Sequence, residues 1–379
     1  MSTQVSSVYV HAPFCARRCN YCDFAVQVRK EGDLEGWRDA IAGELRAVQE
    51  EGLFALAPSL ATLYVGGGTP SLLGAGAMSA LAALLGPERL RAPHLEWTAE
   101  ANPESLTTEV AEQWRRAGVN RLSLGAQTFH GPTLSWMGRM HGPDGPARAI
   151  GIARESGLTN LSVDLMFGLP RRLERDWTAD LEGVLALDVP HVSLYGLTVE
   201  SGTPLARAVV AGKEIPVDDE MYRDEYLLAV EMLGAAGYEH YEVSNFARPG
   251  FASRHNTAYW DGSAYLGLGN GSHSYADPVR RWNLADWDDY RTTVAAGLLP
   301  EAEREEIGPT ERGLERVWLG LRTGEGLPVE DLNHEQRQRV ARWVKEGWTA
   351  SVEPRVRLNA QGWLLLDRLA VDLDSGAVG

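Results

Sequence analysis

The sequence of 379 residues is poor in cysteine, and its only three are Cys15, Cys19 and Cys22. An odd number of cysteines gathered in one short stretch cannot form the disulfide framework that stabilises small secreted proteins. Thiols that merely fill gaps in a core would instead be spread along the chain. We therefore interpret the three cysteines as metal ligands in a reducing compartment.

The chain also lacks an excess of basic residues and any long hydrophobic run. Its 36 Lys and Arg against 52 Asp and Glu give a formal net charge of −16, which disfavours nonspecific binding to nucleic acid or to an anionic membrane. The longest apolar stretch, 72–86, is diluted by alanine and glycine and falls short of the ~20 residues of a membrane-spanning helix. Residues 1–7 lack the basic start and apolar stretch of an export signal. We expect a cytoplasmic protein without a nucleic-acid partner.

What the chain does contain, from residue 7 to residue 198, is a repeated alternation of a short β-rich run and a helical pattern. The β-rich runs are 8–10, 62–65, 95–97, 121–124, 161–165 and 191–195. The helical patterns between them are 34–51, 78–85, 109–117, 146–155 and 176–187. Strands separated by helices in this way indicate βαβ units with a parallel sheet. Six units are too few for a closed eight-stranded barrel, which leaves a partial (β/α)6 barrel or a doubly wound α/β sheet.

The pattern changes after residue 198. A helix is expected over 217–237 and is followed by a region rich in glycine and aromatic residues, and we assign 201–304 to an α+β extension of a core that spans 1–200. The last segment, 305–379, is expected to form a small winged-helix-like module. Its predicted elements are helices over 310–322 and 333–346 and strands over 356–358 and 363–366. The acidic charge and the lack of a basic helix favour a packing role for this module over DNA binding.

Polar residues and glycines follow the predicted strands at the point where each strand ends. They lie at 66–69, 100–103 and 125–127 and at Asp164 and Gly196. Ligands of parallel α/β folds bind at the carboxyl ends of the strands, so these positions predict one site built from several units.

The cysteines have the spacing Cys-x3-Cys-x2-Cys and lie in the loop after the first predicted strand. Three thiolates on a short loop can hold three irons of a [4Fe–4S] cluster and leave the fourth iron open to a small molecule. A closed zinc site requires a fourth ligand, for which His11 is the candidate. Arg17 and Arg18 are expected to help keep the thiols ionised. The pattern favours the cluster over zinc.

This loop and six later motifs resemble the radical S-adenosylmethionine (SAM) superfamily, and within it the oxygen-independent coproporphyrinogen III dehydrogenase-like branch. The resemblance runs from about residue 8 to residue 275. The motifs are Tyr9-Val-His-Ala-Pro-Phe-Cys15, Gly66-Gly-Gly-Thr-Pro-Ser71, Glu100-Ala-Asn-Pro103, Gly118-Val-Asn-Arg-Leu-Ser-Leu-Gly-Ala-Gln-Thr-Phe129, Gly138-Arg-Met-His141, Asp164-Leu-Met-Phe-Gly-Leu-Pro170 and Tyr241-Glu-Val-Ser-Asn-Phe246.

The resemblance implies that Cys15, Cys19 and Cys22 hold a [4Fe–4S] cluster whose open iron binds SAM. It assigns the methionine part of SAM to Gly67, Gly68 and Thr69 in the glycine-rich turn, and the ribose to Glu100 and Gln127. It assigns the SAM carboxylate to Arg139 and the adenosine to Asp164. Tyr9 and Tyr21 are expected to flank the cluster and the cofactor.

One departure narrows the resemblance further. The dehydrogenase pattern has a fourth cysteine two residues after the third, but this chain has Phe24 there, and its Cys-Asp-Phe is similar to the HemW heme-chaperone group. The segment 254–260 matches that group's His-Asn-x-x-Tyr-Trp motif. The resemblance makes His255 a candidate axial ligand of heme iron, with Tyr259 and Trp260 as flat apolar faces for a porphyrin.

A second departure places two arginines after Pro170, where relatives often carry Gly-Gln. We hypothesise that Arg171 and Arg172 contact the propionates of a porphyrin.

Three functions follow from these observations. The first is a heme chaperone that binds a [4Fe–4S] cluster, SAM and heme and passes heme to acceptor proteins. An electron donor is a further expected partner, and peripheral contact with membrane-bound acceptors is compatible with this role. The second is an enzyme, a radical SAM coproporphyrinogen III dehydrogenase that forms protoporphyrinogen IX. The third is a structural zinc protein.

Overall fold

The computed structural model describes residues 2–374 and is built around one curved sheet of twelve strands. The strand order is β11-β12-β10-β9-β8-β7-β6-β2-β13-β14-β15-β16. Its middle consists of six parallel strands, β2 (Ser7–Ala12), β6 (Thr62–Gly67), β7 (Glu96–Ala101), β8 (Arg121–Gln127), β9 (Asn160–Phe167) and β10 (His191–Gly196). The six predicted β-rich runs therefore lie side by side in chain order.

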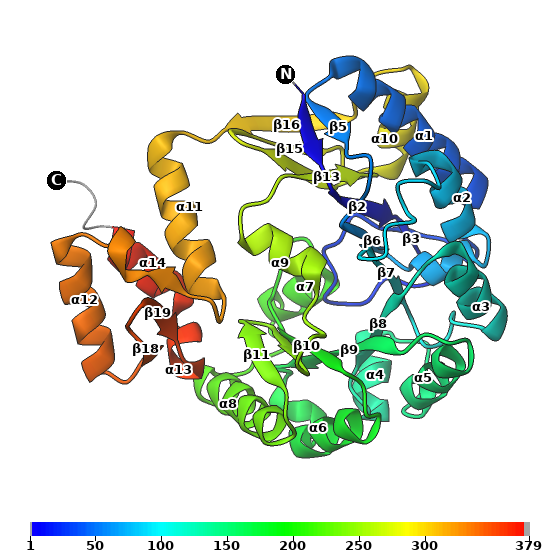
Figure 1. The fold of residues 1–379 in the computed structure, drawn as a ribbon. Helices are drawn as coiled ribbons and strands as arrows, with labels where there is room; N and C mark the ends of the chain where they lie inside the picture. The colour runs from blue at the N-terminus through cyan, green and yellow to red at the C-terminus, as the bar shows by residue number, and fades with distance from the viewer. Residues whose placement is uncertain (1, 375–379) are drawn as a thin grey trace.

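Helices cover the outer side of this sheet (Figure 1). They are α1 (Leu34–Glu51), α2 (Ala77–Leu85), α3 (Thr108–Ala117), α5 (Gly145–Glu155), α6 (Trp177–Ala186) and α8 (Asp219–Ala235). The short helix α4 (Gly131–Met137) instead packs its Met137 in a separate cluster with Met166 and Leu169. Several begin at a capping side chain: Thr107 accepts from Val110 N, and Asp176 accepts from Ala179 N. The polar residue before each hydrophobic pattern thus fixes where the helix starts.

The two faces of the parallel strands differ in chemistry because side chains alternate along a strand. Val8, Leu63 and Leu122 are fully buried in the core formed with the outer helices. The alternate residues, such as Thr98 and Ser123, belong to a polar inner face. The inner face is therefore more polar than the outer face, although Thr98 and Ser123 are themselves buried.

The sheet is not closed in the described residues, because its order ends at β11 on one side and β16 on the other. Residues of the predicted extension, 201–304, add strands on both sides of the six predicted ones; β13 pairs with β2 in parallel, and the other added pairs are antiparallel. These are β11 (Glu239–Glu242) and β12 (Asn245–Ala247) beyond β10, and β13 (Tyr265–Leu268), β14 (His273–Ala276) and β15 (Val279–Asn283) beyond β2, followed by β16 (Glu301–Glu306). The predicted α/β fold with a partial barrel is confirmed, and the doubly wound alternative is not.

Three further helices belong to this region, α7 (Pro204–Val210), α9 (Arg254–Trp260) and α10 (Trp287–Ala295). Short elements complete it: the parallel pairs β1 (Thr3–Val5) with β5 (Phe54–Leu56) and β3 (Phe14–Cys15) with β4 (Gln27–Val28), and the 3-10 turns η1 (Pro70–Leu73) and η2 (Arg171–Leu173). Among them, α9 is the helix that packs against β6 from the inner side.

The C-terminal segment forms a separate lobe with its own hydrophobic cluster around Leu321, Trp343 and Val356 (Figure 1). Its elements are α11 (Pro309–Arg322), β17 (Leu327–Pro328), η3 (Val329–Asp331), α12 (His334–Lys345), β18 (Thr349–Ser351), β19 (Arg355–Leu358), α13 (Ala360–Trp363) and α14 (Leu366–Asp374). Residues 375–379 of the predicted module, like residue 1 of the predicted core, lie outside the described residues.

One predicted strand in this lobe is wrong. Residues 363–366 do not pair with 356–358, because Trp363 ends α13 and Leu366 begins α14, and β19 pairs with β17 and β18 instead. The Asn359 side chain accepts from Gly362 N at 3.0 Å and starts a helical turn where we expected a strand-connecting turn.

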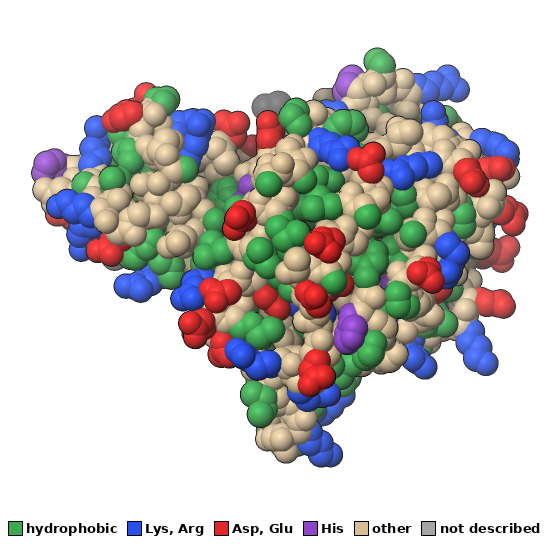
Figure 2. Space-filling model, turned by 90° about the horizontal axis from the view of Figure 1, so that it is seen from below, with side chains coloured by type: hydrophobic (Ala, Val, Ile, Leu, Met, Phe, Trp, Pro, Cys, Tyr) green, Lys and Arg blue, Asp and Glu red, His purple; other side chains and the backbone are tan. Residues whose placement is uncertain are grey.

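The surface mixes charges of both signs. On the face in Figure 2, acidic, basic and hydrophobic side chains are interspersed. Within the described part of the chain, no helix combines the length and the apolar character needed to cross a bilayer.

Candidate functional site

The three cysteines lie in a loop whose two ends are held together by β3 and β4. Cys15 is the last residue of β3, which pairs with β4 in the register Phe14 to Gln27. Cys22 N donates to the carbonyl of Cys19 at 3.3 Å, which folds the middle of the loop into a turn. All three thiols are half-buried and line one cavity of about 320 Å³, which we call the cysteine cavity.

We expected the neighbouring arginines to favour ionisation of the thiols, but for two of the three thiols burial acts in the opposite direction. Burial raises the pKa of the Cys15 thiol to about 11, and it also raises the pKa of the Cys22 thiol. Arg18 donates to the backbone carbonyls of Cys22 and Phe24, so its main contact is with the loop rather than with a sulfur atom. A metal that binds these cysteines as thiolates therefore has to displace the thiol protons.

The cavity fits a polynuclear cluster better than one zinc ion. Among residues 2–374, no three His, Cys, Asp or Glu side chains converge as ligands of a single metal ion. The proposed fourth zinc ligand, His11, is engaged at both ring nitrogens, since Nδ1 lies 3.1 Å from the Tyr9 hydroxyl and Nε2 lies 3.0 Å from the Ala25 carbonyl oxygen. Three thiols spread around one cavity suit a cluster whose separate irons each take one sulfur.

The residues that the resemblance assigned to SAM, except Tyr9, line the same cavity. They are Tyr21, Gly67, Gly68, Thr69, Glu100, Gln127, Arg139 and Asp164. They come from the cysteine loop, from β6 to β9 and from the segment after α4. The structure therefore brings together side chains more than a hundred residues apart, as expected for the carboxyl ends of parallel strands.

The glycine turn after β6 leaves no room for side chains. Gly67 has φ +107°, and a Cβ there would lie 2.3 Å from the His11 ring. A Cβ on Gly68 would lie 2.7 Å from the carbonyl oxygen of Ala12 and 2.8 Å from that of Phe14. The absence of side chains lets the backbone of this turn form part of the cavity wall.

Two half-buried carboxyl groups face the cavity from β7 and β9. Glu100 accepts from the Tyr64 hydroxyl at 2.7 Å and from Gly67 N at 3.0 Å, and Asp164 accepts from the Ser123 hydroxyl at 3.1 Å. Burial raises the pKa of Glu100 to about 7, with a further contribution from the charge of Asp164. Burial also raises the pKa of Asp164. Such carboxyls can accept hydrogen bonds from ribose hydroxyls or adenine amines.

Gln127 ends β8 in a strained conformation. Its φ of +68° is unusual for a residue with a side chain, and the pairing of β8 with β9 shifts register between Gly125 and Gln127. Strain of this kind is typical of functional sites, where it aims a side chain at a ligand.

Sequence reasoning missed Asn102, which links the cysteine side of the cavity to Arg139. Its Nδ2 donates to the Thr69 hydroxyl at 3.1 Å, and that hydroxyl lies 3.4 Å from the Cys15 sulfur. Its Oδ1 accepts from Arg139 Nη2 at 2.7 Å, and Arg139 also donates to the Gly125 carbonyl. The signal was present, because Asn102 belongs to the quoted motif Glu100-Ala-Asn-Pro103.

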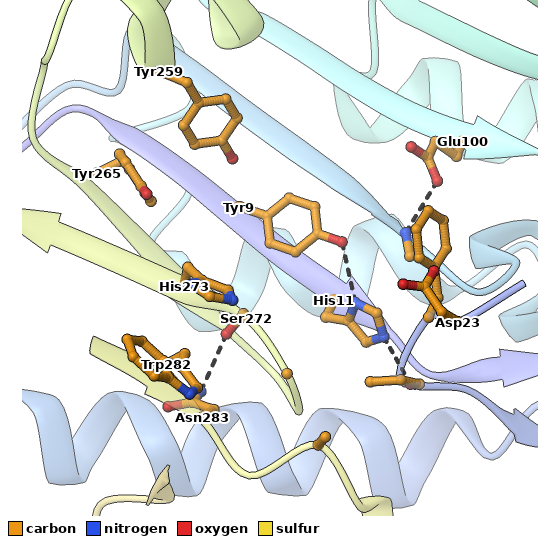
Figure 3. Close-up of a pocket in the computed structure, with 15 residues that line it drawn as sticks. Tyr9, His11, Asp23, Glu100, Tyr259, Tyr265, Ser272, His273, Trp282 and Asn283 are labelled. Atoms are coloured by element: carbon orange, nitrogen blue, oxygen red, sulfur yellow. Dashed lines mark hydrogen bonds between the residues drawn. The ribbon is translucent and has the colours of Figure 1, made fainter. Parts of the chain in front are cut away.

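A second cavity of about 570 Å³, which we call the aromatic cavity, adjoins the first. The two share Phe24, Gly67 and Glu100. Figure 3 shows Tyr9, Tyr259, Tyr265 and Trp282 converging on the second cavity from different elements, and Phe24 also lines it. Tyr9 thus faces the aromatic cavity rather than the cysteine cavity.

The structure separates the three predicted heme contacts of α9. His255 is 1% exposed and lines neither cavity; its Nδ1 lies 2.7 Å from the Thr62 hydroxyl and its Nε2 lies 2.9 Å from the Tyr259 hydroxyl. Tyr259 lines the aromatic cavity, whereas Trp260 lines a different one and packs under Arg322 at 4.3 Å. Iron ligation by His255 stays a prediction, and it requires His255 to give up a hydrogen bond.

The two arginines after Pro170 are paired with carboxylates. Arg171 forms an ion pair with Asp218 at 2.8 Å, and Arg172 pairs with Glu214. Neither arginine lines the cysteine or the aromatic cavity. This placement gives no support to the hypothesis that they contact propionates.

Comparisons with known proteins agree with this geometry. Residues 9–182 match the sequence model of the Radical SAM superfamily. The chain is 38% identical over 369 residues to a protein of Mycobacterium tuberculosis named heme chaperone HemW, covering 97% of this chain and 94% of that one. It is 33% identical over 325 residues to the Bacillus subtilis protein of the same name, covering 85% of each.

Among solved structures, the chain is similar to that of coproporphyrinogen III oxidase (HemN) from Escherichia coli, described as a radical SAM enzyme. The TM-score is 0.81 at 23% identity, covering 98% of this chain and 90% of the other. At this identity the likeness establishes the fold.

Proposed function

Because the chain belongs to the HemW family of the radical SAM superfamily, we propose that it is a heme chaperone, which binds heme and passes it to acceptor proteins. The observation that carries this proposal is the pair of adjoining cavities. One is lined by the three cysteines and by the residues expected to bind SAM, and the other is lined by aromatic rings. The two cavities give a flat apolar cargo a place beside the cofactor site.

In this proposal Cys15, Cys19 and Cys22 hold a [4Fe–4S] cluster, and SAM lies along the rest of the cysteine cavity. A bound cluster with SAM supplies one-electron reduction chemistry, for which an electron donor is a required partner. The protein's own part is positioning. Arg139, held by Asn102 and Gly125, offers a fixed guanidinium to a carboxylate, and Glu100 and Asp164 offer acceptors to the nucleoside.

Heme is the cargo and is assigned to the aromatic cavity. Tyr259 and Tyr265 lie edge to face with ring centroids 4.6 Å apart and line its wall, a lining suited to a porphyrin. A volume of about 570 Å³ is within the usual range for sites of organic ligands, roughly 300 to 1,000 Å³. A chaperone has to release what it binds, which fits a site at the surface better than a buried one.

Phe24 favours the chaperone over the dehydrogenase. It stands where the dehydrogenase pattern has a fourth cysteine, it is 57% exposed, and it belongs to the shared wall of the two cavities. An apolar side chain in that position can contact a porphyrin edge and cannot serve as a thiol.

The experiment that tests the proposal is an anaerobic heme titration of the full chain after reconstitution with iron and sulfide, followed by mixing with apo-myoglobin as a heme acceptor. The proposal expects a saturable Soret band and its replacement by the spectrum of the myoglobin complex. Absence of heme binding, together with formation of protoporphyrinogen from coproporphyrinogen when SAM and a reductant are added, would favour the dehydrogenase and reject the chaperone.

A further inference from the structure

The aromatic cavity contains a histidine that no motif had singled out. His273 begins β14, is exposed, and faces the cavity (Figure 3). Its ring stacks on Trp282, its cross-strand neighbour on β15, with centroids 5.5 Å apart and planes 23° apart. This stacking holds the imidazole plane in one orientation without occupying either ring nitrogen.

The availability of those nitrogens distinguishes His273 from the other histidines near the site. Within residues 2–374, the His273 ring stacks on Trp282 and forms no hydrogen bond or ion pair. His11, which also lines the cavity, uses both ring nitrogens in contacts to Tyr9 and Ala25. His255 uses both as well and lies behind Tyr259 rather than in the cavity wall.

We propose that His273 supplies the axial nitrogen ligand to the iron of heme bound in the aromatic cavity, an inference that rests on the proposed chaperone function. The step is coordination alone: a lone pair of the neutral imidazole binds the iron, and no electron or proton is transferred. Desolvation, with a contribution from nearby Arg280 that Glu305 opposes, lowers the pKa of His273 and so favours the neutral imidazole that can bind iron.

The charges of the cavity orient the porphyrin. Of the described residues that line it, Asp23 and Glu100 are acidic and none is Lys or Arg. Propionates are therefore directed away from the interior and towards solvent, while the apolar edge of the ring lies near Tyr259 and Phe24. A single protein ligand and exposed propionates suit a heme that has to leave again.

The test uses the full chain reconstituted anaerobically and titrated with hemin, with absorption and resonance Raman spectra as readouts. Wild type is compared with His273→Ala, with His255→Ala and with His334→Ala, an exposed histidine on α12 in the C-terminal lobe that serves as the matched control. We expect His273→Ala to lose the iron–histidine signal and to bind heme about tenfold or more weakly. Added imidazole is expected to restore the six- or five-coordinate wild-type spectrum in His273→Ala. The variants His255→Ala and His334→Ala are expected to keep the wild-type spectrum without added imidazole.

The outcomes separate the inference from the proposed function. If wild type binds heme and His273→Ala retains the axial-nitrogen spectrum, the inference is overturned while the chaperone proposal stands. Loss of that spectrum in His255→Ala with a native circular dichroism spectrum, and its retention in His273→Ala, assigns the ligand to α9 and also overturns the inference. If wild type binds no heme, the proposed function itself fails.

Discussion

The Nε2 atom of His255 lies 2.9 Å from the hydroxyl of Tyr259, one helical turn further along α9, and this bond divides the motif into a buried half and a cavity-facing half. His255 is held beneath the cavity by Thr62 and stacks on Tyr64 at 5.1 Å, while the ring of Tyr259 forms part of the cavity wall. His255 thereby fixes the orientation of the Tyr259 ring, and in the proposed function Tyr259 is the residue of this pair that contacts heme.

This division predicts different effects for the two aromatic residues of α9. Tyr259→Ala removes a wall of the aromatic cavity and is expected to weaken heme binding about tenfold, as for loss of one buried aromatic contact. Trp260→Ala serves as the control, because Trp260 packs under Arg322 outside that cavity. It is expected to lower the free energy of unfolding and to leave the heme Kd unchanged. Equal losses of heme affinity in both variants would contradict the assignment.

The glycine turn gives a prediction on folding stability and SAM binding. Gly67→Ala places a Cβ 2.3 Å from the His11 ring at a residue with φ +107°, and we expect the free energy of unfolding to fall by about 2 to 4 kcal/mol. Gly74→Ala is the control, since Gly74 has φ +84° but no atom within 4 Å of its Cβ position.

Urea denaturation measures both variants, and isothermal titration with SAM measures the site. The account expects Gly67→Ala to lose more stability than Gly74→Ala and to lose SAM binding as well. A Gly67→Ala protein that binds SAM like wild type would show that the turn does not contact the cofactor.

The paired state of Arg171 and Arg172 predicts that they are dispensable for heme. The double variant Arg171→Ala/Arg172→Ala removes the ion pairs to Asp218 and Glu214, of which the first is largely exposed and contributes little to stability. We expect a heme Kd within about twofold of wild type in the Soret titration. A large loss of affinity would revive the idea that these arginines contact propionates.

The buried carboxyl of Glu44 predicts a pH dependence of stability. Glu44 on α1 accepts from Gly269 N at 2.7 Å and from the Tyr290 hydroxyl at 2.6 Å, and burial raises its pKa to about 7. Between pH 4.5 and 7 the folded state therefore holds a proton that the unfolded state has released, so this group's contribution to stability falls as the pH rises through that window.

The measurement is the free energy of unfolding of wild type and Glu44→Gln at pH 5 and pH 8. From pH 5 to pH 8, the free energy of unfolding of wild type is expected to fall relative to that of Glu44→Gln by up to about 3 kcal/mol. Glu100 titrates in both proteins, so its contribution to the pH dependence of stability cancels in the difference between them. A difference that does not change with pH would contradict the raised pKa of Glu44.

The sequence was sufficient for the parts of the site that depend on local order along the chain. Cys15 lies beyond the end of β2, Gly67 ends β6, Glu100 lies near the end of β7 and Asp164 lies within β9. Parallel pairing brings the carboxyl ends of these neighbouring strands to one edge of the sheet. Their meeting in one cavity could therefore be expected from spacing and strand order.

The parts that could not be predicted depend on contacts between distant segments. Glu96 accepts from the backbone nitrogens of Arg254 and His255 at the start of α9, and this contact across more than 150 residues fixes how α9 enters the inner side of the sheet. Without it, the burial of His255 cannot be known. His273 was missed for the same reason, because its access to the cavity depends on how β14 and β15 extend the sheet beyond β2.

The most direct test of the chaperone account is the transfer of heme from the loaded, cluster-containing protein to apo-myoglobin, followed by absorption spectroscopy under anaerobic conditions. The account predicts that the reconstituted chain binds heme and that its spectrum is replaced by that of the myoglobin complex. A reconstituted chain that takes up no heme, or that binds heme and never gives it to the acceptor, would contradict it.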